Sequence, residues 1–423
     1  MTMRNRVKEY WKALGPGLTT GAADDDPSGI ATYSQVGASH GFSFAWLSLF
    51  SFPLMGVVSE MCARIGIVTG IGLAENIKRH YSKTALYLCT FLLVFANVFN
   101  IGADLGAMGK ATELLFPKAP FPLLVILFAI LSLLLQVFIP YKKYSKYLKY
   151  LTFALFTYVL SALTLAIDWS DVLYHTIIPT MNFGRDEIVL ICAVLGTTIS
   201  PYLFFWQTSV EVEEQIMKGE TTEESRRLNV SKKEINDMRL DVWSGALVSN
   251  LVMFSIIAVC GAVLFKNGIT NIESAEQAAL ALRPFAGDFS YFLFTLGIIG
   301  TGLLAIPVLA GSASYAVSES LKWKEGLYLN FKQAYSFYGV IIVAMLLGIG
   351  LNFIGLHPIK TLIYSAVLNG IISPIMIFFI LRISSDSNIM NGYKNNRITN
   401  IVGWFTFLVM SLVSIFVVVS LVL

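Results

Sequence analysis

The sequence is poor in charged residues, cysteines and histidines, and each shortage excludes a class of protein. Charged residues make up 13% of the 423 residues, which is about half their usual share in soluble domains. The four cysteines are scattered through apolar runs without paired spacing, which excludes a disulfide framework and a zinc site. No nucleophile–base pair and no glycine-rich phosphate loop is visible. We therefore expect no enzyme, no bound cofactor and no nucleic-acid partner.

Long apolar runs are abundant, and they predict an all-α integral membrane protein. Hydrophobic residues make up 56% of the chain, and runs of about 20 of them are long enough to cross a bilayer. Because a helix satisfies its own backbone groups in lipid, the runs favour helices over barrel strands. We expect eleven spans in one transmembrane domain covering residues 1–423. The expected spans are 13–38 (broken), 43–66, 84–108, 120–139, 147–167, 187–209, 242–265, 288–316, 334–353, 358–381 and 400–422.

The distribution of lysine and arginine predicts how these spans are oriented. With residues 1–12 as a cytoplasmic tail, 24 of the 30 basic residues fall on the cytoplasmic side and six on the outer side. Such a bias is expected of a multi-pass protein of the plasma membrane. The polar segment 211–241 is then cytoplasmic, either as short helices or as a solvated loop. The pattern leaves the oligomeric state open and is compatible with a monomer.

Two of the expected spans contain helix-breaking residues at mid-length. The stretch "TGAADDDPSGIATYSQ" (20–35) places three acids before Pro27, Ser28 and Gly29, and "GTTISPYLFFWQTS" (196–209) contains Pro201. Proline removes a backbone donor, so we expect unwinding at Asp26–Gly29 and Thr197–Pro201. Pro201 taken alone is equally compatible with a simple kink. The two breaks are five spans apart, which is typical of a LeuT-like inverted repeat, here 13–167 and 187–381, with the substrate between the breaks.

Acids inside membrane spans are functional candidates because burying them is costly. Asp26 borders the first break and is the leading cation ligand. Neighbouring helical residues point about 100° apart, so Asp24 and Asp25 cannot both face the ion beside Asp26. They either line an aqueous path or stabilise the ligands without contacting the ion. Asp104 is either a proton-path residue or a partner in helix packing. Glu60 and Arg64 are one turn apart, and we expect them to form a structural ion pair.

The residues around both breaks resemble the Nramp family of divalent-metal transporters. The segment "LGPGLTTGAADDDPSGIAT" resembles the family's first span, whose hallmark is Asp-Pro-Gly-Asn. "SEMCARIGIVTGIGLAENI" (59–77) resembles the segment after the family's second span, and "GADLGAMGKA" resembles its third span. "GTTISPYLFFWQTS" resembles span six, whose hallmark is Met-Pro-His. The resemblance is weaker after span six. It implies an eleven-span fold with a five-plus-five inverted repeat.

The ligand positions that the resemblance implies are only partly kept. Asp26 keeps the family's aspartate, and Thr197 occupies the position that offers a backbone carbonyl. Gly29 replaces the asparagine ligand, and Ser200 replaces the methionine whose sulfur favours manganese and iron. With Gln207 as a further candidate, every ligand expected here is oxygen, which suits Mg²⁺ and Mn²⁺. This pattern resembles a magnesium-transporting branch of the family.

Three further departures concern the movement of protons. Tyr202 and Gln207 replace two histidines that the family associates with proton movement, and Ala107 replaces a glutamate one turn after Asp104. We therefore expect a transporter that moves Mg²⁺ or Mn²⁺ with weak or no proton coupling. The alternative is a transporter of the same fold that has lost its divalent-metal site and carries another solute.

Overall fold

The computed structural model describes residues 14–139, 141–180, 184–272, 275–354 and 358–422, and within these ranges it contains helices but no strands. Nine of the described helical segments are long and apolar enough to cross a membrane, and the apolar helix α16 is shorter. The first expected span is divided between two short helices, as described below. The all-helical fold is confirmed, whereas the count of eleven spans stays a prediction. The expected cytoplasmic tail, 1–12, lies outside the described residues.

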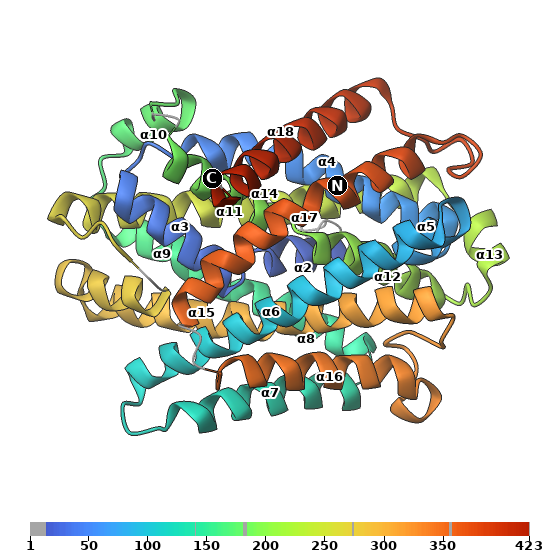
Figure 1. Cartoon of the computed structure of the whole chain (residues 1–423), viewed down its shortest axis with the longest axis horizontal. Helices are drawn as coiled ribbons and strands as arrows, with labels where there is room; N and C mark the ends of the chain where they lie inside the picture. Colours follow the sequence, from blue (N-terminus) through green and yellow to red (C-terminus); the bar gives the residue numbers. More distant parts are fainter. Residues whose placement is uncertain (1–13, 140, 181–183, 273–274, 355–357, 423) are drawn as a thin grey trace, which may run out of the picture.

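Figure 1 shows the helices packed into one bundle, with α2 and α11 near its centre. Two of the expected spans correspond to pairs of half-helices, and one corresponds to a helix with a 3₁₀ segment. The main elements are α2 (Pro16–Ala23), α3 (Pro27–His40), α4 (Trp46–Thr69), α5 (Leu73–His80), α6 (Lys83–Leu115), α7 (Phe121–Phe138), α8 (Tyr141–Leu151), η1 (Thr152–Leu155), α9 (Phe156–Thr164), α10 (Trp169–Ile177), α11 (Arg185–Thr198), α12 (Pro201–Met217), α13 (Glu223–Leu228), α14 (Lys232–Val263), η2 (Phe265–Asn267), α15 (Ala275–Leu321, interrupted at Gly287), η3 (Phe331–Gln333), α16 (Tyr335–Leu351), α17 (Pro358–Ser385) and α18 (Arg397–Val422).

The first break lies slightly earlier in the chain than the sequence predicts. The non-helical residues are Asp24–Asp26, whereas Pro27, Ser28 and Gly29 form the first turn of α3. The prediction of an unwound Asp26–Gly29 segment was therefore wrong in its bounds. Proline is well accommodated at the first position of a helix, where its missing N–H has no helical partner in any case. Pro27 thus begins the second half-helix instead of unwinding it.

The second break is confirmed, but it is also shorter than predicted. Helix α11 ends at Thr198, Ile199 and Ser200 are non-helical, and α12 begins at Pro201. Thr197 therefore belongs to the last turn of α11, and Pro201 opens a helix as Pro27 does. Both breaks leave a C-terminal helix end facing an N-terminal one inside the bundle, where unwound backbone is tolerated because protein surrounds it.

The polar segment 211–241 is largely helical. Helix α12 continues to Met217, α13 is a separate short helix, and α14 begins at Lys232, ten residues before the expected start of span seven. Ser231 caps α14 by accepting a hydrogen bond from the Glu234 N–H over 3.1 Å. The long extensions of α12 and α14 thus form the walls of a polar region at one end of the bundle.

The short half-helix α2 is held tightly against α14. A Cβ atom on Gly21 would lie 2.4 Å from the backbone of Gly245, and one on Gly17 would lie 2.6 Å from the Val242 nitrogen. Glycine is required at these positions because any larger side chain would push the two backbones apart. This contact fixes the distance between α2 and α14.

Asp241 of α14 fixes the start of α2. Its carboxylate accepts hydrogen bonds from the backbone N–H groups of Gly15 and Gly17, both at 2.7 Å, and of Leu18 at 2.9 Å. These are N–H groups that the helix itself cannot satisfy. The negative charge also lies at the positive end of the helix dipole. A side chain from another helix therefore serves as the cap of α2.

The expected ion pair between Glu60 and Arg64 is not formed. Glu60 instead lies 2.9 Å from the guanidinium of Arg239, and Arg64 donates to the side-chain oxygen of Asn395 and to the Tyr393 carbonyl. Helical spacing brings the two residues onto one face, but Glu60 finds its partner on helix α14 and Arg64 finds its partners in the non-helical segment between α17 and α18. Both residues still have structural roles, because each joins α4 to another part of the chain.

Apolar side chains are exposed on the outer helices of the bundle. Leu127 on α7 is 54% exposed, and Leu412 and Ile415 on α18 are 59% and 62% exposed. A surface of this kind suits contact with lipid tails, whereas polar residues are collected inside the bundle. The polar interior is therefore the place to look for a site.

Candidate functional site

Four acids are enclosed in the centre of the bundle. Asp24, Asp25 and Asp104 are 0% exposed, and Asp26 is 1% exposed. Three of them form the link between α2 and α3, and the fourth lies on α6. Isolated buried charges cost many kilocalories per mole unless they are paired or bind a cation. The partners of each acid therefore indicate what it can do.

Asp26 is the best-supported of the four acids. One carboxylate oxygen, Oδ1, accepts hydrogen bonds from the Ser28 hydroxyl at 2.6 Å and the Gly29 N–H at 2.7 Å, so that Asp26 caps α3. The other, Oδ2, accepts from the Asn100 amide of α6 at 2.6 Å. Asn100 in turn accepts from the Ser365 hydroxyl of α17. About four lone-pair positions exist on a carboxylate, so Asp26 keeps room for about one further partner.

Asp24 and Asp25 share one donor. The Ser249 hydroxyl of α14 lies 2.8 Å from Asp24 Oδ2 and 3.3 Å from Asp25 Oδ1. A hydroxyl has a single proton and can serve only one of them at a time. Within the described residues, Asp24 Oδ1 and Asp25 Oδ2 are buried without a hydrogen-bond partner. These two acids are thus supplied with fewer donors than Asp26.

Asp104 is the least satisfied acid of the group. Both of its carboxylate oxygens are buried and have no hydrogen-bond partner in the described part of the chain. It lies one helical turn after Asn100 on α6, so the two side chains share a face. Asp104 therefore faces the region in which Asn100 binds Asp26, close to the backbone N–H of Ser28, and both sequence hypotheses for Asp104 stay open.

The second break contributes hydroxyl and carbonyl oxygens. The Ser200 hydroxyl is within hydrogen-bonding distance of the Gly196 carbonyl, at 2.6 Å, and of the Thr197 carbonyl, at 2.7 Å. The Ser373 hydroxyl of α17 donates to the Ile199 carbonyl at 2.5 Å. Carbonyl groups at the C-terminal end of α11 and in the break thus accept hydrogen bonds from serine hydroxyl groups. The side-chain groups described at this break are uncharged.

Three contacts bring the two breaks together. The Tyr202 hydroxyl of α12 donates to the Ala23 carbonyl at the end of α2 over 2.9 Å. The Thr197 hydroxyl lies 3.4 Å from the Asp24 carbonyl oxygen. A Cβ atom on Gly29 would be only 2.9 Å from the Thr197 hydroxyl, so the lack of a side chain at this position allows the close approach. The two breaks therefore face each other.

The residues that the sequence proposed for the site are not all placed together. Asp26, Gly29, Thr197, Ser200 and Tyr202 lie at or beside the two breaks. Gln207 is seven residues beyond Ser200, about 10 Å along α12. Its amide donates to Glu211 Oε1 at 2.7 Å. Gln207 is thus bonded within α12 to a residue that lies further from the breaks than Gln207 itself.

Sequence reasoning missed Asn100 and Ser249, which donate to the acids, and Ser365, which donates to Asn100. Asn100 carried a usable signal, because it is an amide one turn from Asp104 inside an apolar helix. Ser249 and Ser365 carried none. A serine in an apolar helix commonly bonds to the carbonyl four residues earlier, and only the packing of helices shows which serine does otherwise.

The described residues contain no group of three or more histidine, cysteine, aspartate and glutamate side chains arranged to hold a metal ion. A cation at the breaks would therefore be bound by one or two carboxylates, with neutral oxygens and water completing its shell. Hard cations such as Mg²⁺ are commonly bound in this way. The donor set fits a hard ion that keeps part of its water.

Comparison with known proteins places the chain in a family. The family profile described as "Natural resistance-associated macrophage protein-like" matches residues 17–420. The divalent metal cation transporter MntH of Caldanaerobacter subterraneus subsp. tengcongensis is 25% identical over 407 residues, covering 94% of this chain and 90% of that protein. MntH of Klebsiella pneumoniae subsp. pneumoniae is 24% identical over 401 residues, covering 92% and 90%.

Solved structures share the fold. A crystal structure of the Eremococcus coleocola manganese transporter has a TM-score of 0.77 at 18% identity, covering 98% of this chain and 87% of that chain. Mhp1, a nucleobase-cation-symport-1 family transporter, has a TM-score of 0.54 at 14% identity, covering 95% and 91%. These similarities confirm a LeuT-like fold with broken helices. Because the family profile spans nearly the whole chain, this protein belongs to the Nramp family of membrane transporters for divalent metal cations.

Proposed function

We propose that the protein moves a hard divalent cation, Mg²⁺ or Mn²⁺, through the plasma membrane and that this movement is coupled weakly or not at all to protons. The observation that carries the proposal is the set of carboxylate oxygens on Asp24, Asp25 and Asp104 that have no hydrogen-bond partner among the described residues and lie beside Asp26, the cap of α3. A cation at the breaks would supply the positive charge that this buried group lacks.

The choice of ion follows from the donors. Carboxylate, hydroxyl, carbonyl and water oxygens suit Mg²⁺ and Mn²⁺, whereas a thioether or thiolate would favour softer metals. Asp26 and the oxygens of Thr197 and Ser200 are the ligands we propose, and the lack of a side chain at Gly29 lets the Thr197 hydroxyl come close to the first break. Among the relatives, MntH proteins are divalent metal cation transporters and the Eremococcus protein is a manganese transporter, which supports a divalent cargo.

Weak coupling to protons follows from two side chains. Gln207 has no proton to exchange and donates to Glu211. Tyr202 uses its hydroxyl to hold the Ala23 carbonyl, and a tyrosine keeps its proton near neutral pH. Asp24, Asp25 and Asp104 remain as candidates for an aqueous or proton path. The N-terminus is proposed to be cytoplasmic, as the distribution of basic residues predicts.

The experiment that tests this function is calorimetric titration of Mg²⁺, Mn²⁺, Ca²⁺ and Cd²⁺ into the detergent-solubilised protein, followed by uptake into proteoliposomes. We expect weak binding of Mg²⁺ or Mn²⁺ and no preference for Cd²⁺. Tight Cd²⁺ binding with transport in preference to Mg²⁺ would contradict the argument from ligand softness. If none of the four ions binds, the hypothesis of a lost metal site and a different solute gains support.

A further inference from the structure

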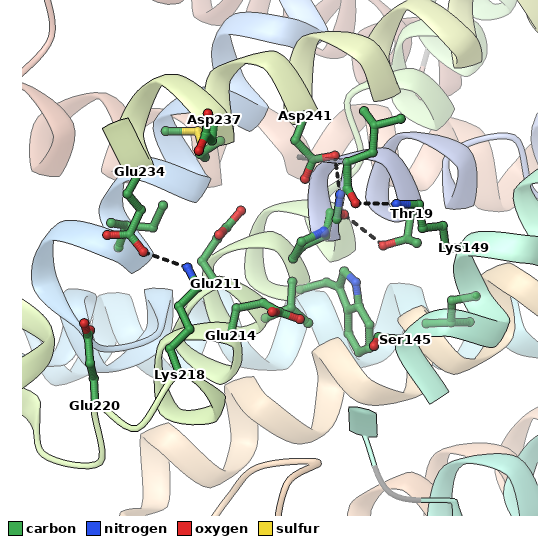
Figure 2. Close-up of a pocket in the computed structure, with 18 of the residues that line it drawn as sticks. Thr19, Ser145, Lys149, Glu211, Glu214, Lys218, Glu220, Glu234, Asp237 and Asp241 are labelled. Carbon is green, nitrogen blue, oxygen red and sulfur yellow. Dashed lines mark hydrogen bonds and ion pairs between the residues drawn. The ribbon is translucent and has the colours of Figure 1, made fainter. Parts of the chain in front are cut away.

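A second polar region lies at the end of the bundle where α12 finishes and α14 begins. Here a cavity of about 620 Å³ opens between α2, α8, α12 and α14. Figure 2 shows acidic side chains reaching it from α12 on one side and from α14 on the other. It is separate from the four buried acids, none of which lines it. Its chemistry therefore needs an explanation of its own.

The lining of the cavity is rich in carboxylates. Six of them face four lysine ammonium groups, so the lining carries an excess of negative charge. The carboxylates belong to Glu211, Glu214, Glu220, Glu234, Asp237 and Asp241. An excess of one sign of charge in a hollow with protein walls raises the local concentration of ions of the opposite sign.

Most of the nearby positive charge is engaged or lies in solvent. The Lys218 ammonium is 2.9 Å from Glu234, and that of Lys149 donates to the Leu14 carbonyl at 2.5 Å. Lys146 and Lys233 are exposed. Asp241 is likewise engaged, because it caps α2. Glu234 is engaged by Lys218, whereas Glu211 on α12 and Asp237 on α14 are carboxylates that line the cavity without an ion pair among the described contacts.

Glu211 is the buried member of this set. It is 6% exposed, and its Oε1 atom accepts a hydrogen bond from the Gln207 amide at 2.7 Å. Figure 2 shows its carboxylate pointing from α12 toward α14, where Asp237 and Asp241 project. A largely buried carboxylate held in place by one neutral amide favours a cation beside it.

Two other buried atoms in the wall have no protein partner. Within the described residues these are Nε1 of Trp206, a residue that is 1% exposed, and Oε2 of Glu220. Both residues line the cavity. Buried polar atoms of this kind are normally satisfied by water or a ligand. The wall is therefore suited to a hydrated occupant, which can both donate and accept hydrogen bonds.

The cavity is also close to the helix breaks. Thr19 lines it and is five residues before Asp24, about 7 Å along α2. Trp206 lines it and is six residues after Ser200 on α12. The same two half-helices that form the breaks thus form its walls. A cation leaving the breaks along α2 and α12 would enter this cavity.

We propose that this cavity is a second binding station, which holds a hydrated divalent cation through water between Glu211 and Asp237. The inference rests on the proposed function, since it takes the cargo to be a divalent cation. No three acids converge as direct ligands among the described residues, so the ion keeps its water shell. Mg²⁺ in particular gives up its water reluctantly.

The test is Mn²⁺ binding to the full-length, detergent-solubilised protein, followed by electron paramagnetic resonance. In an Asp26→Ala background, which removes the site at the breaks, a weaker class of bound Mn²⁺ should remain, and proton double-resonance spectra should show bound water. Adding Glu211→Gln should weaken this class by about fivefold or more. Glu224→Gln, at an exposed acid on α13 outside the cavity, is the matched control and should change nothing.

A second variant shows whether weaker Mn²⁺ binding in Glu211→Gln arises only from a folding defect. Asp237→Asn alters an exposed residue on the opposite wall and should also weaken the residual Mn²⁺ class. Loss of all Mn²⁺ binding in Asp26→Ala, or residual binding that neither variant weakens, would overturn the second station and leave the proposed function intact. Absence of Mn²⁺ and Mg²⁺ binding to the unaltered protein would overturn both.

Discussion

The two helix breaks have the same shape but different chemistry. Both place a proline at the first position of the second half-helix and leave two or three residues non-helical before it. The first break contains three carboxylates, whereas the second contains the neutral oxygens of Ile199 and Ser200. The caps differ as well, since Asp26 caps α3 with its own side chain and the Ser200 side chain does not cap α12.

This difference indicates that the two breaks contribute different properties to the proposed site. In the proposed function the first break supplies charge, and the second supplies neutral ligands and determines which ions are preferred. Carboxylates alone would attract any cation of a suitable size, without selecting between hard and soft ions. Discrimination between hard and soft ions depends on the neutral donors. The two breaks can therefore be tested separately.

The largest effect is expected from the charge of the first break. Asp26→Ala should abolish the tighter class of Mg²⁺ and Mn²⁺ binding in calorimetry and leave only the weaker class proposed for the second station. Loss of the helix cap should cost about 1 kcal/mol of stability. Asp26→Asn is the matched control, because it keeps a capping oxygen but removes the charge, and it should lose binding with a smaller loss of stability. Normal binding by Asp26→Asn would show that Asp26 is only a cap.

The next effect is expected from the second break. Ser200→Met introduces a thioether, and the ratio of Cd²⁺ to Mg²⁺ affinity should rise by about tenfold in competition titrations. Ser200→Ala is the control for loss of the hydroxyl, which otherwise bonds to the Gly196 and Thr197 carbonyls. An equal rise in the ratio with alanine would mean that space, and not sulfur, determines the preference.

A smaller effect is expected from Asp24. It shares the Ser249 donor with Asp25 and is not part of the cap. Asp24→Ala should weaken the apparent Mg²⁺ affinity by about threefold to tenfold through the loss of its field. Because Asp24 is 0% exposed, added salt should screen this effect little. Loss of the whole tighter class of binding, equal to that in Asp26→Ala, would show that both carboxylates ligate the ion directly.

The smallest effect is expected from the contact that joins the breaks. Tyr202→Phe removes the hydrogen bond to the Ala23 carbonyl and should cost about 1 kcal/mol of stability. Metal uptake and the acidification measured with a pH dye inside proteoliposomes should be unchanged. If the unaltered protein shows robust metal-dependent acidification and Tyr202→Phe abolishes it, then Tyr202 lies on a proton path and the proposal of weak coupling is wrong.

Much of the fold was predictable because its signals are local. Runs of apolar residues, the bias of lysine and arginine, and Pro27 and Pro201 each act within one segment, and together they indicate membrane helices with two breaks. The bounds of the breaks were predicted less well. A proline is read from sequence as a disruption, yet its place at the first position of a helix depends on a cap such as Asp26 that forms only when the chain has folded.

The site was predictable to a lesser degree because its contacts join distant parts of the chain. Asp26 was identified from its intramembrane position, but its donor Asn100 lies on α6 and the donor Ser249 lies on α14. Asn100 carried a local signal that did not name its partner, and nothing in the local sequence distinguishes Ser249 from a packing residue. Glu60 illustrates the opposite error, in which a local sequence signal predicts a contact that does not form. Its helical neighbour Arg64 has the right spacing, but Arg239 on another helix is the partner that it binds.

Asp26 caps α3 and is also the proposed cation ligand, and this double role affects how fast the cation binds. Its carboxylate keeps room for about one further partner, so a cation held by both oxygens must displace Ser28 or Gly29 from Oδ1 while giving up some of its own water. Capture is then a double exchange, slower than diffusion alone would allow. The first turn of α3 loses its cap at the same moment, so loading of the cargo and fraying of this helix end become a single kinetic event.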